Sequence, residues 1–227
     1  MFSPNMETIF KDARVWGNQV LNEADLTPAL ARLTLYTVAG SAFYGFTMGL
    51  RQSFVQAAAA AVKVPILFFV TLLICLPTLY FVSLFFGSRI RFTQAMVVLL
   101  TGLSITSILL GSFAPISLFF LLSGSSYTFL LLMHVIVFTF CGLAGLYTIQ
   151  RHFHYLGLRV ADEVDQMVQI RGRVILQLWM FLYMFVGSQM AYVLAPFVGR
   201  DPLFVFFRAP DNNFYTYLIQ LVMDLVR

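Results

Sequence analysis

The stretch "VPILFFVTLLICLPTLYFVSLFFG", residues 64–87, is apolar from end to end and contains no charged residue. About 20 such residues are enough for a helix to cross the hydrocarbon core of a bilayer. The stretch therefore predicts a membrane-spanning helix and decides the fold class. Pro77 stands near its middle, where a proline removes one backbone hydrogen bond and clashes with the carbonyl group four residues back. The functional question is whether this proline serves transport or only shapes the protein.

The composition extends this prediction to the whole chain. Of the 227 residues, 60% are hydrophobic and 11% are charged, whereas an average soluble domain is about 25% charged. Asp, Glu, Lys and Arg are absent from residues 64–87, 92–150 and 174–199. We therefore expect an all-α, polytopic integral membrane helix bundle. Residues 1–32 are polar and mixed in charge, so no cleavable signal peptide is expected.

The apolar segments predict a single transmembrane domain over residues 29–227, with about five spans. These spans are expected at residues 33–50, 65–87, 93–111, 127–149 and 174–195. Residues 92–122 are too long for one ordinary span and contain "GSFAP" at 111–115. We therefore expect a break at residues 112–114, followed by a shorter helix over 115–122. Pro65 is expected to open the second span, after a stretch of strong helix formers at residues 56–62 that either lies at the interface or leads into the span.

Three further segments have the pattern of amphipathic helices at the membrane surface. They are residues 1–28, residues 156–173 and a tail helix at 214–227. In the first segment, Thr27 is expected to cap the helix that follows, with Pro28 in its first position. In the second, Asp162, Glu163 and Asp165 form a charged face that we expect to be solvated.

The basic residues predict an orientation. With five spans, nine Lys and Arg residues fall on the N-terminal side and five on the other. Cytoplasmic segments of membrane proteins carry an excess of Lys and Arg. We therefore expect a multi-pass protein of the cell (inner) membrane, with a cytoplasmic N-terminus and an external C-terminus. The formal charge of +4 then reflects topology and contact with lipid headgroups, and no nucleic-acid partner is expected.

Catalytic motifs are not found in the sequence. It contains no GxSxG, no HExxH and no phosphate-binding loop, and the expected spans hold no Asp or Glu. Ion-coupled transport and intramembrane aspartyl catalysis depend on such ionisable groups. We therefore expect no enzymatic activity, no cofactor and no metal site. Cys75 and Cys141 fall inside expected spans, where a packing role is expected.

One ionisable side chain, His134, does fall inside an expected span. Intramembrane ionisable groups are functional candidates by default, so His134 is a candidate for gating, protonation or ligand binding. The alternative is a neutral imidazole that is hydrogen-bonded between helices. Gln189 has the same two interpretations, and interhelical hydrogen bonding is favoured for it.

Prolines and small residues supply the remaining candidates. Pro77 and Pro115 interrupt two expected spans, and paired broken helices mark the binding site of some transporters. The alternative is that both prolines only shape a compact bundle. Ser41, Gly45 and Gly49 recur at four-residue spacing, a pattern that lets helix backbones approach closely in lipid. We expect these three residues to pack against the chain's own helices, with dimerisation as the alternative.

The stretch "KVPILFFVTLLICLPTLYFVSLFFGSRIRFTQAMVVLLTGLSITSILLGSFAPISLFFLL" and the later "GSQMAYVLAPFVG" resemble a family of uncharacterised bacterial polytopic membrane proteins. Some members of that family carry the label of actin-binding WH2 proteins. The WH2 motif needs a basic LKKT-like stretch after a short amphipathic helix, and the chain has no such stretch. The five-span layout also resembles the Yip1 family of membrane-trafficking scaffolds.

Two functions are compatible with the sequence. The first is a non-enzymatic membrane subunit or scaffold, whose partners are the lipid bilayer and either other membrane proteins or further copies of the chain. The second is an oligomeric channel or passive permeation protein that uses Pro77, Pro115 and His134. A membrane enzyme that acts on lipids is less favoured, because the acids at 162–165 are expected to form a solvated face.

Overall fold

A computed structural model describes most of the chain, namely residues 13–22, 25–85, 91–160, 166–194, 213–216, 218–219 and 223. Over these residues the protein is all-helical, as the sequence predicted. The helices are α2 (Ala13–Asn22), α3 (Thr27–Gly49), α4 (Phe54–Phe85), α5 (Phe92–Leu122), α6 (Tyr127–Val160) and α7 (Gln166–Leu194). Of the expected tail helix at 214–227, the structure describes residues 214–216, 218–219 and 223, all of them helical, and it describes half of the expected segment at 1–28, where α2 lies.

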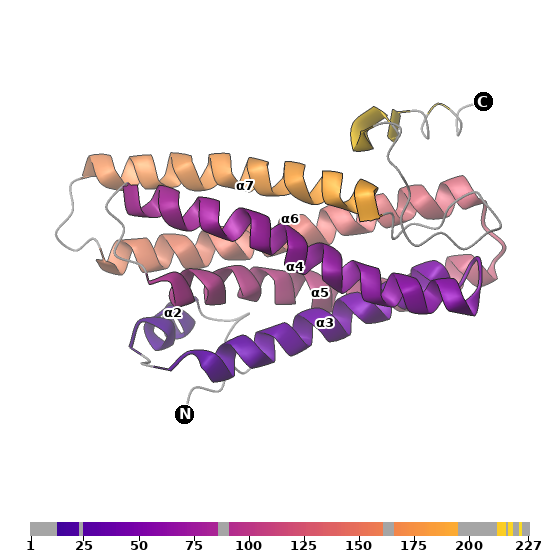
Figure 1. Cartoon of the computed structure of the whole chain (residues 1–227), viewed down its shortest axis with the longest axis horizontal. Helices are drawn as coiled ribbons and strands as arrows, with labels where there is room; N and C mark the ends of the chain where they lie inside the picture. The colour runs from indigo at the N-terminus through magenta and orange to yellow at the C-terminus, as the bar shows by residue number, and fades with distance from the viewer. Residues whose placement is uncertain are drawn as a thin grey trace.

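The five long helices lie side by side along the longest axis of the molecule, and consecutive helices run in opposite directions (Figure 1). The turns at residues 50–53 and 123–126 therefore lie at one end of the bundle, and α2 lies at the other. Helix α3 packs extensively on both α4 and α5, while α6 packs on α5 and α7 packs on α4. Contacts between α6 and α7 are sparse, so α7 is held mainly by α4.

Three of the helices are long and apolar enough to cross a membrane. The qualifying segments are Phe54–Phe81, Phe92–Leu122 and Tyr127–Phe153. This finding, made over the described residues, fits a membrane protein of the all-α class. At 32 residues and 1.5 Å per residue, α4 is about 48 Å long, which exceeds the roughly 30 Å of a hydrocarbon core.

Helix α4 is longer at its start than expected. We expected the span to begin at Pro65, after a stretch at 56–62 that lies at the interface or leads into the span, but the helix begins at Phe54 and contains both Pro65 and Pro77. The alanine-rich residues before Pro65 are strong helix formers, and two of them pack against glycines of α3. The stretch at 56–62 and the span are therefore one continuous helix, as in the second of these two alternatives.

Helix α5 is also continuous, whereas we expected a break at residues 112–114 before a separate helix at 115–122. A proline removes one backbone hydrogen bond and crowds the carbonyl four residues back, and Pro115 is on the exposed side of the helix. On the opposite side, Ala114 and Ser117 are buried, and the backbone at Gly111 approaches Gly40 of α3. Packing of the residues before and after Pro115 in the sequence therefore keeps the helix continuous.

The expected surface helix at residues 156–173 is not a separate element. Helix α6 continues to Val160, and α7 begins at Gln166, so the ends of two long helices make up most of this segment. An amphipathic pattern does not distinguish a surface helix from the ends of long helices that project into water, because both have one wet face. Asp162, Glu163 and Asp165 lie outside the described residues.

The start of α3 differs from its expected capping. Leu26 occupies the N-cap position, one residue earlier than the Thr27 that we expected. The carboxylate Oδ1 of Asp25 accepts a hydrogen bond from the Thr27 N–H over 2.9 Å. Hydrogen bonds from the side chain and the backbone N–H of Thr27 hold the pKa of Asp25 below its ordinary value.

Candidate functional site

Polar and apolar side chains are distributed as in a protein surrounded by lipid. Large apolar side chains are exposed on all five long helices, among them Leu35, Phe43, Leu73, Phe119, Ile136, Leu178 and Phe181. Uncharged polar side chains are buried between the helices, among them Thr37, Ser41, Thr71, Thr101, Ser104, Thr106, Ser107, Ser117 and His134. Polar residues of membrane spans are expected to face the interior of the bundle.

The hydroxyl groups between α3 and α5 form a hydrogen-bonded contact across the two helices. The Oγ of Ser104 lies 2.8 Å from the carbonyl oxygen of Leu33 on α3 and 2.8 Å from that of Leu100 on its own helix. The Oγ1 of Thr37 also donates to the Leu33 carbonyl and lies 3.2 Å from the Ser104 Oγ. These hydroxyls are therefore engaged in joining two helices.

The other hydroxyls of the segment "TGLSITSILLGS" are mostly engaged within α5. Thr101 donates to the carbonyl oxygen of Val97, and Thr106 donates to that of Gly102. The Oγ of Ser107 is buried and has no partner among the described residues. Such bonds satisfy a hydroxyl inside its own helix, so this segment does not present a row of free hydroxyls to a permeant.

Glycines bring the helix backbones into close contact. A Cβ atom at Gly45 would lie 2.6 Å from the carbonyl oxygen of Ala60, and one at Gly49 would lie 2.5 Å from that of Gln56. Gly45 and Gly49 thus face α4 of the same chain, and the neighbouring Ser41 is buried. A Cβ atom at Gly145 on α6 would lie 2.6 Å from the carbonyl oxygen of Gly102 on α5.

His134 is buried on α6 and contacts α3. Its Nδ1 lies 2.8 Å from the hydroxyl oxygen of Tyr44, and the two rings meet edge to face, with centroids 5.5 Å apart. The Tyr44 ring also packs on Phe138, one turn further along α6, and Phe138 packs on Phe68 of α4. Three aromatic rings from three helices therefore form a layer next to His134.

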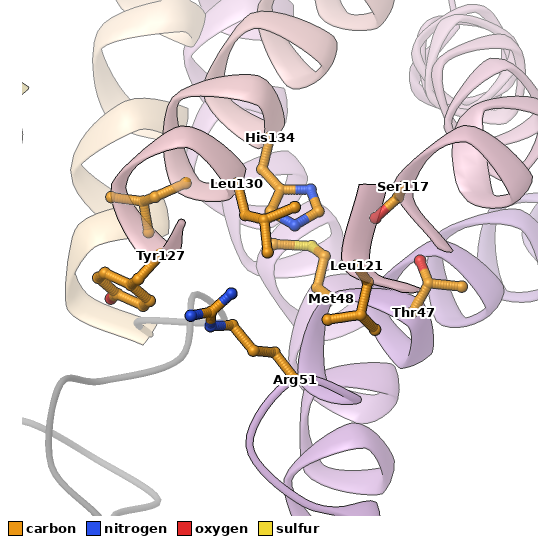
Figure 2. Close-up of a pocket in the computed structure, with 9 residues that line it drawn as sticks. Thr47, Met48, Arg51, Ser117, Leu121, Tyr127, Leu130 and His134 are labelled. Carbon is orange, nitrogen blue, oxygen red and sulfur yellow. The ribbon is translucent and has the colours of Figure 1, made fainter. Parts of the chain in front are cut away.

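A small pocket lies on the other side of His134, towards the end of the bundle that carries the turns at 50–53 and 123–126 (Figure 2). It is lined by Thr47, Met48, Arg51, Ser117, Leu121, Tyr127, Leu130, Leu131 and His134. Its volume is about 20 Å³, and a water molecule needs about 10–15 Å³ measured in this way. The pocket therefore has room for about one water.

Arg51 lies at the mouth of this pocket. Its side chain is exposed and donates a hydrogen bond of 2.7 Å to the carbonyl oxygen of Ser125. Its guanidinium carbon lies 5.9 Å from the centre of the Tyr127 ring, a distance suited to a cation–π contact. Arg51 therefore joins the α3–α4 turn to the α5–α6 turn.

No family model, no curated protein and no solved structure matches the chain. Its sequence and geometry are therefore the guides to its function.

The other candidates from the sequence are not assembled around His134. Pro77 and Pro115 are exposed on the outer faces of α4 and α5, and neither lines the pocket. Gln189 is half-buried on α7, which contributes no lining residue. Within the described ranges, no group of three His, Cys, Asp or Glu side chains is close enough to hold a metal ion. Cys75 and Cys141 are buried free thiols.

Two buried ionisable groups were not predicted from the sequence. Lys63 is 2% exposed inside α4. His152 is buried beneath Trp16 of α2, with ring centroids 4.4 Å apart. Two features of the sequence could have indicated these buried positions. The alanine run before Lys63 favours a helix that continues through it, and Trp16 in the amphipathic N-terminal segment supplies an aromatic ring that can cover His152.

Proposed function

We propose that the chain is a non-enzymatic integral membrane subunit or scaffold that associates with other membrane proteins or with further copies of itself. The observation that supports this proposal best is that the polar groups inside the bundle are mostly hydrogen-bonded to helix backbones. Most buried hydroxyls bond to helix backbones, and the pocket next to His134 takes about one water. With the interior of the described helices occupied in this way, the outer surface is the place where such a protein acts.

We further propose five spans, because α3 and α7 lie alongside the three helices that qualify by length and composition (Figure 1). The proposed orientation places the N-terminus in the cytoplasm and the C-terminus outside, on the basis of the nine basic residues against five. The resemblance to bacterial polytopic proteins favours the inner membrane. Five antiparallel spans would place the turns at 50–53 and 123–126 on the external side.

Cysteine labelling in intact cells tests this topology. Asn22 and Ser123 are both exposed, at opposite ends of the bundle, and each is replaced with cysteine. We expect a membrane-impermeant maleimide to label Ser123→Cys from outside, and Asn22→Cys only after the membrane is permeabilised. The two native thiols are buried, so the labelling of the unmodified protein gives the background level. Labelling of both positions from the same side would contradict the five-span arrangement.

Site-specific photo-crosslinking tests the scaffold. Leu178 on α7 and Phe119 on α5 have the same exposed fraction, 64%. Helix α7, however, packs substantially on one helix only, α4, whereas α5 packs on both α3 and α6. With a photoreactive phenylalanine at each position in native membranes, we expect a protein adduct of discrete mass at 178 and only lipid adducts at 119. Lipid adducts alone at both positions would contradict association through α7.

An oligomeric channel is the second candidate. The pocket that reaches His134 favours it, because a buried ionisable group beside a polar pocket is a default functional site in a membrane protein. The continuous course of α4 and α5 through their prolines removes the support that broken helices would give. Since both prolines are on the outer surface, we propose that they shape the helices and take no part in conduction.

A further inference from the structure

The pocket beside His134 combines polar groups with an enclosed end. Three helices supply its walls, with Thr47 on α3, Ser117 on α5 and His134 on α6. Figure 2 shows the Ser117 hydroxyl on the pocket side of α5, and it shows His134 across the pocket from Arg51. The aromatic layer of Tyr44, Phe138 and Phe68 lies beyond His134.

The Ser117 hydroxyl is the unusual member of this group. Its side chain is 2% exposed, yet no described residue forms a hydrogen bond with it. Thr101, Ser104 and Thr106 on the same helix each donate to a backbone carbonyl one turn back. Polar groups inside a protein are normally hydrogen-bonded to protein or to ordered water, so a hydroxyl that lines a pocket favours a polar occupant there.

The size and chemistry of the pocket limit that occupant. A volume of about 20 Å³ admits one water and excludes larger polar ligands. Thr47 donates its own proton to the Tyr44 carbonyl over 2.8 Å, which leaves its hydroxyl oxygen able to accept a hydrogen bond. Ser117 and Thr47 thus supply two of the two to four polar partners that a buried water needs.

We propose that the pocket is a vestibule for one water, which is bound by Ser117 and Thr47 and connects His134 to solution past Arg51. Access comes from this end of the bundle only, because the aromatic layer closes the opposite end. His134 thereby exchanges protons with one side of the membrane, although no path crosses the bundle. The vestibule does not depend on the scaffold proposal, since a scaffold and a channel could both contain it.

Silver ion is a suitable probe, since it is similar in size to a water molecule and reacts with thiols. The thiol S–H bond breaks, an S–Ag bond forms and the proton passes to the buffer. Ser117→Cys places a thiol in the pocket with little change of shape. Two controls are buried outside it, namely Ser107→Cys on the same helix and the native Cys141, two turns beyond His134 and past Phe138. Leu121→Cys provides a second pocket position.

Reconstituted protein is treated with silver nitrate in chloride-free buffer, then denatured and alkylated, and each remaining thiol is quantified by mass spectrometry. Because thiol reactivity depends on access, we expect silver to protect Ser117→Cys and Leu121→Cys about tenfold or more faster than Cys141 and Ser107→Cys. A bulky maleimide applied to the folded variants should leave both pocket thiols unmodified. Protection of the pocket thiols no faster than that of Cys141 would overturn the proposal, and so would their rapid reaction with the maleimide.

Discussion

Replacing Gly145 with valine is expected to separate α5 from α6 and to produce one of the largest losses of stability of any single change in the chain. A Cβ atom at this position would lie 2.6 Å from the Gly102 carbonyl oxygen and closer still to the Thr106 Oγ1. The Gly102 carbonyl is backbone and cannot rotate away, so the two helices must move apart. Overpacking of this kind costs about 1–3 kcal/mol and occasionally more.

Gly142, on the same helix, is the matched control. A Cβ atom there would meet nothing within 4 Å, while the change in helix propensity is the same for both positions. Thermal unfolding in detergent, followed by the loss of the monodisperse peak on size exclusion, is the measurement. We expect Gly145→Val to lower the midpoint strongly and Gly142→Val to lower it little. Equal shifts would mean that α5 and α6 are not in backbone contact at Gly145.

Truncation of Trp179 to alanine is expected to release α7 from the bundle. The Trp179 side chain is 4% exposed, and its Nε1 donates a hydrogen bond of 2.9 Å to the carbonyl oxygen of Cys75 on α4. Loss of a buried tryptophan costs about 3–5 kcal/mol in soluble cores. Helix α7 packs substantially only on α4. The truncation therefore weakens the main contact that holds α7 in the bundle.

Phe181, two residues later on α7, is 67% exposed and serves as the control. Limited proteolysis of the detergent-solubilised protein, with α7 fragments identified by mass spectrometry, is the measurement. We expect Trp179→Ala to expose α7 to cleavage while Phe181→Ala resembles the unmodified protein. If both variants resist cleavage equally, the contact between Trp179 and Cys75 does not hold α7 in place.

The fold class was predictable from local patterns, because the uncharged stretch at 64–87 and its counterparts are long enough to indicate spans by themselves. The close-packing roles of Gly45 and Gly49 were also readable, since helical spacing places both on one face of a helix. The continuity of α5 through Pro115 was not readable. It depends on Gly111 meeting Gly40, and no local rule links residues so far apart in the sequence.

The candidate site was predictable only in its central residue. His134 stood out because an ionisable group inside an apolar segment is rare. Its contact with Tyr44, 90 residues earlier, and the pocket formed with Arg51 and Ser117 depend on the packing of three helices. The burial of Lys63 was not predictable for a related reason, because a lysine near the end of an expected span fits the interface as well as a buried position in a longer helix.

The central claim is that the interior of the bundle is closed and that the protein acts through its surface. Current through planar bilayers that contain only the purified protein tests this claim most directly. We predict no conductance above that of protein-free bilayers, because hydroxyls bonded to helix backbones and the aromatic layer beside His134 interrupt the polar path through the described part of the bundle. The His134→Ala variant should give the same flat record. A reproducible ion current that His134→Ala abolishes would contradict the account and favour the channel.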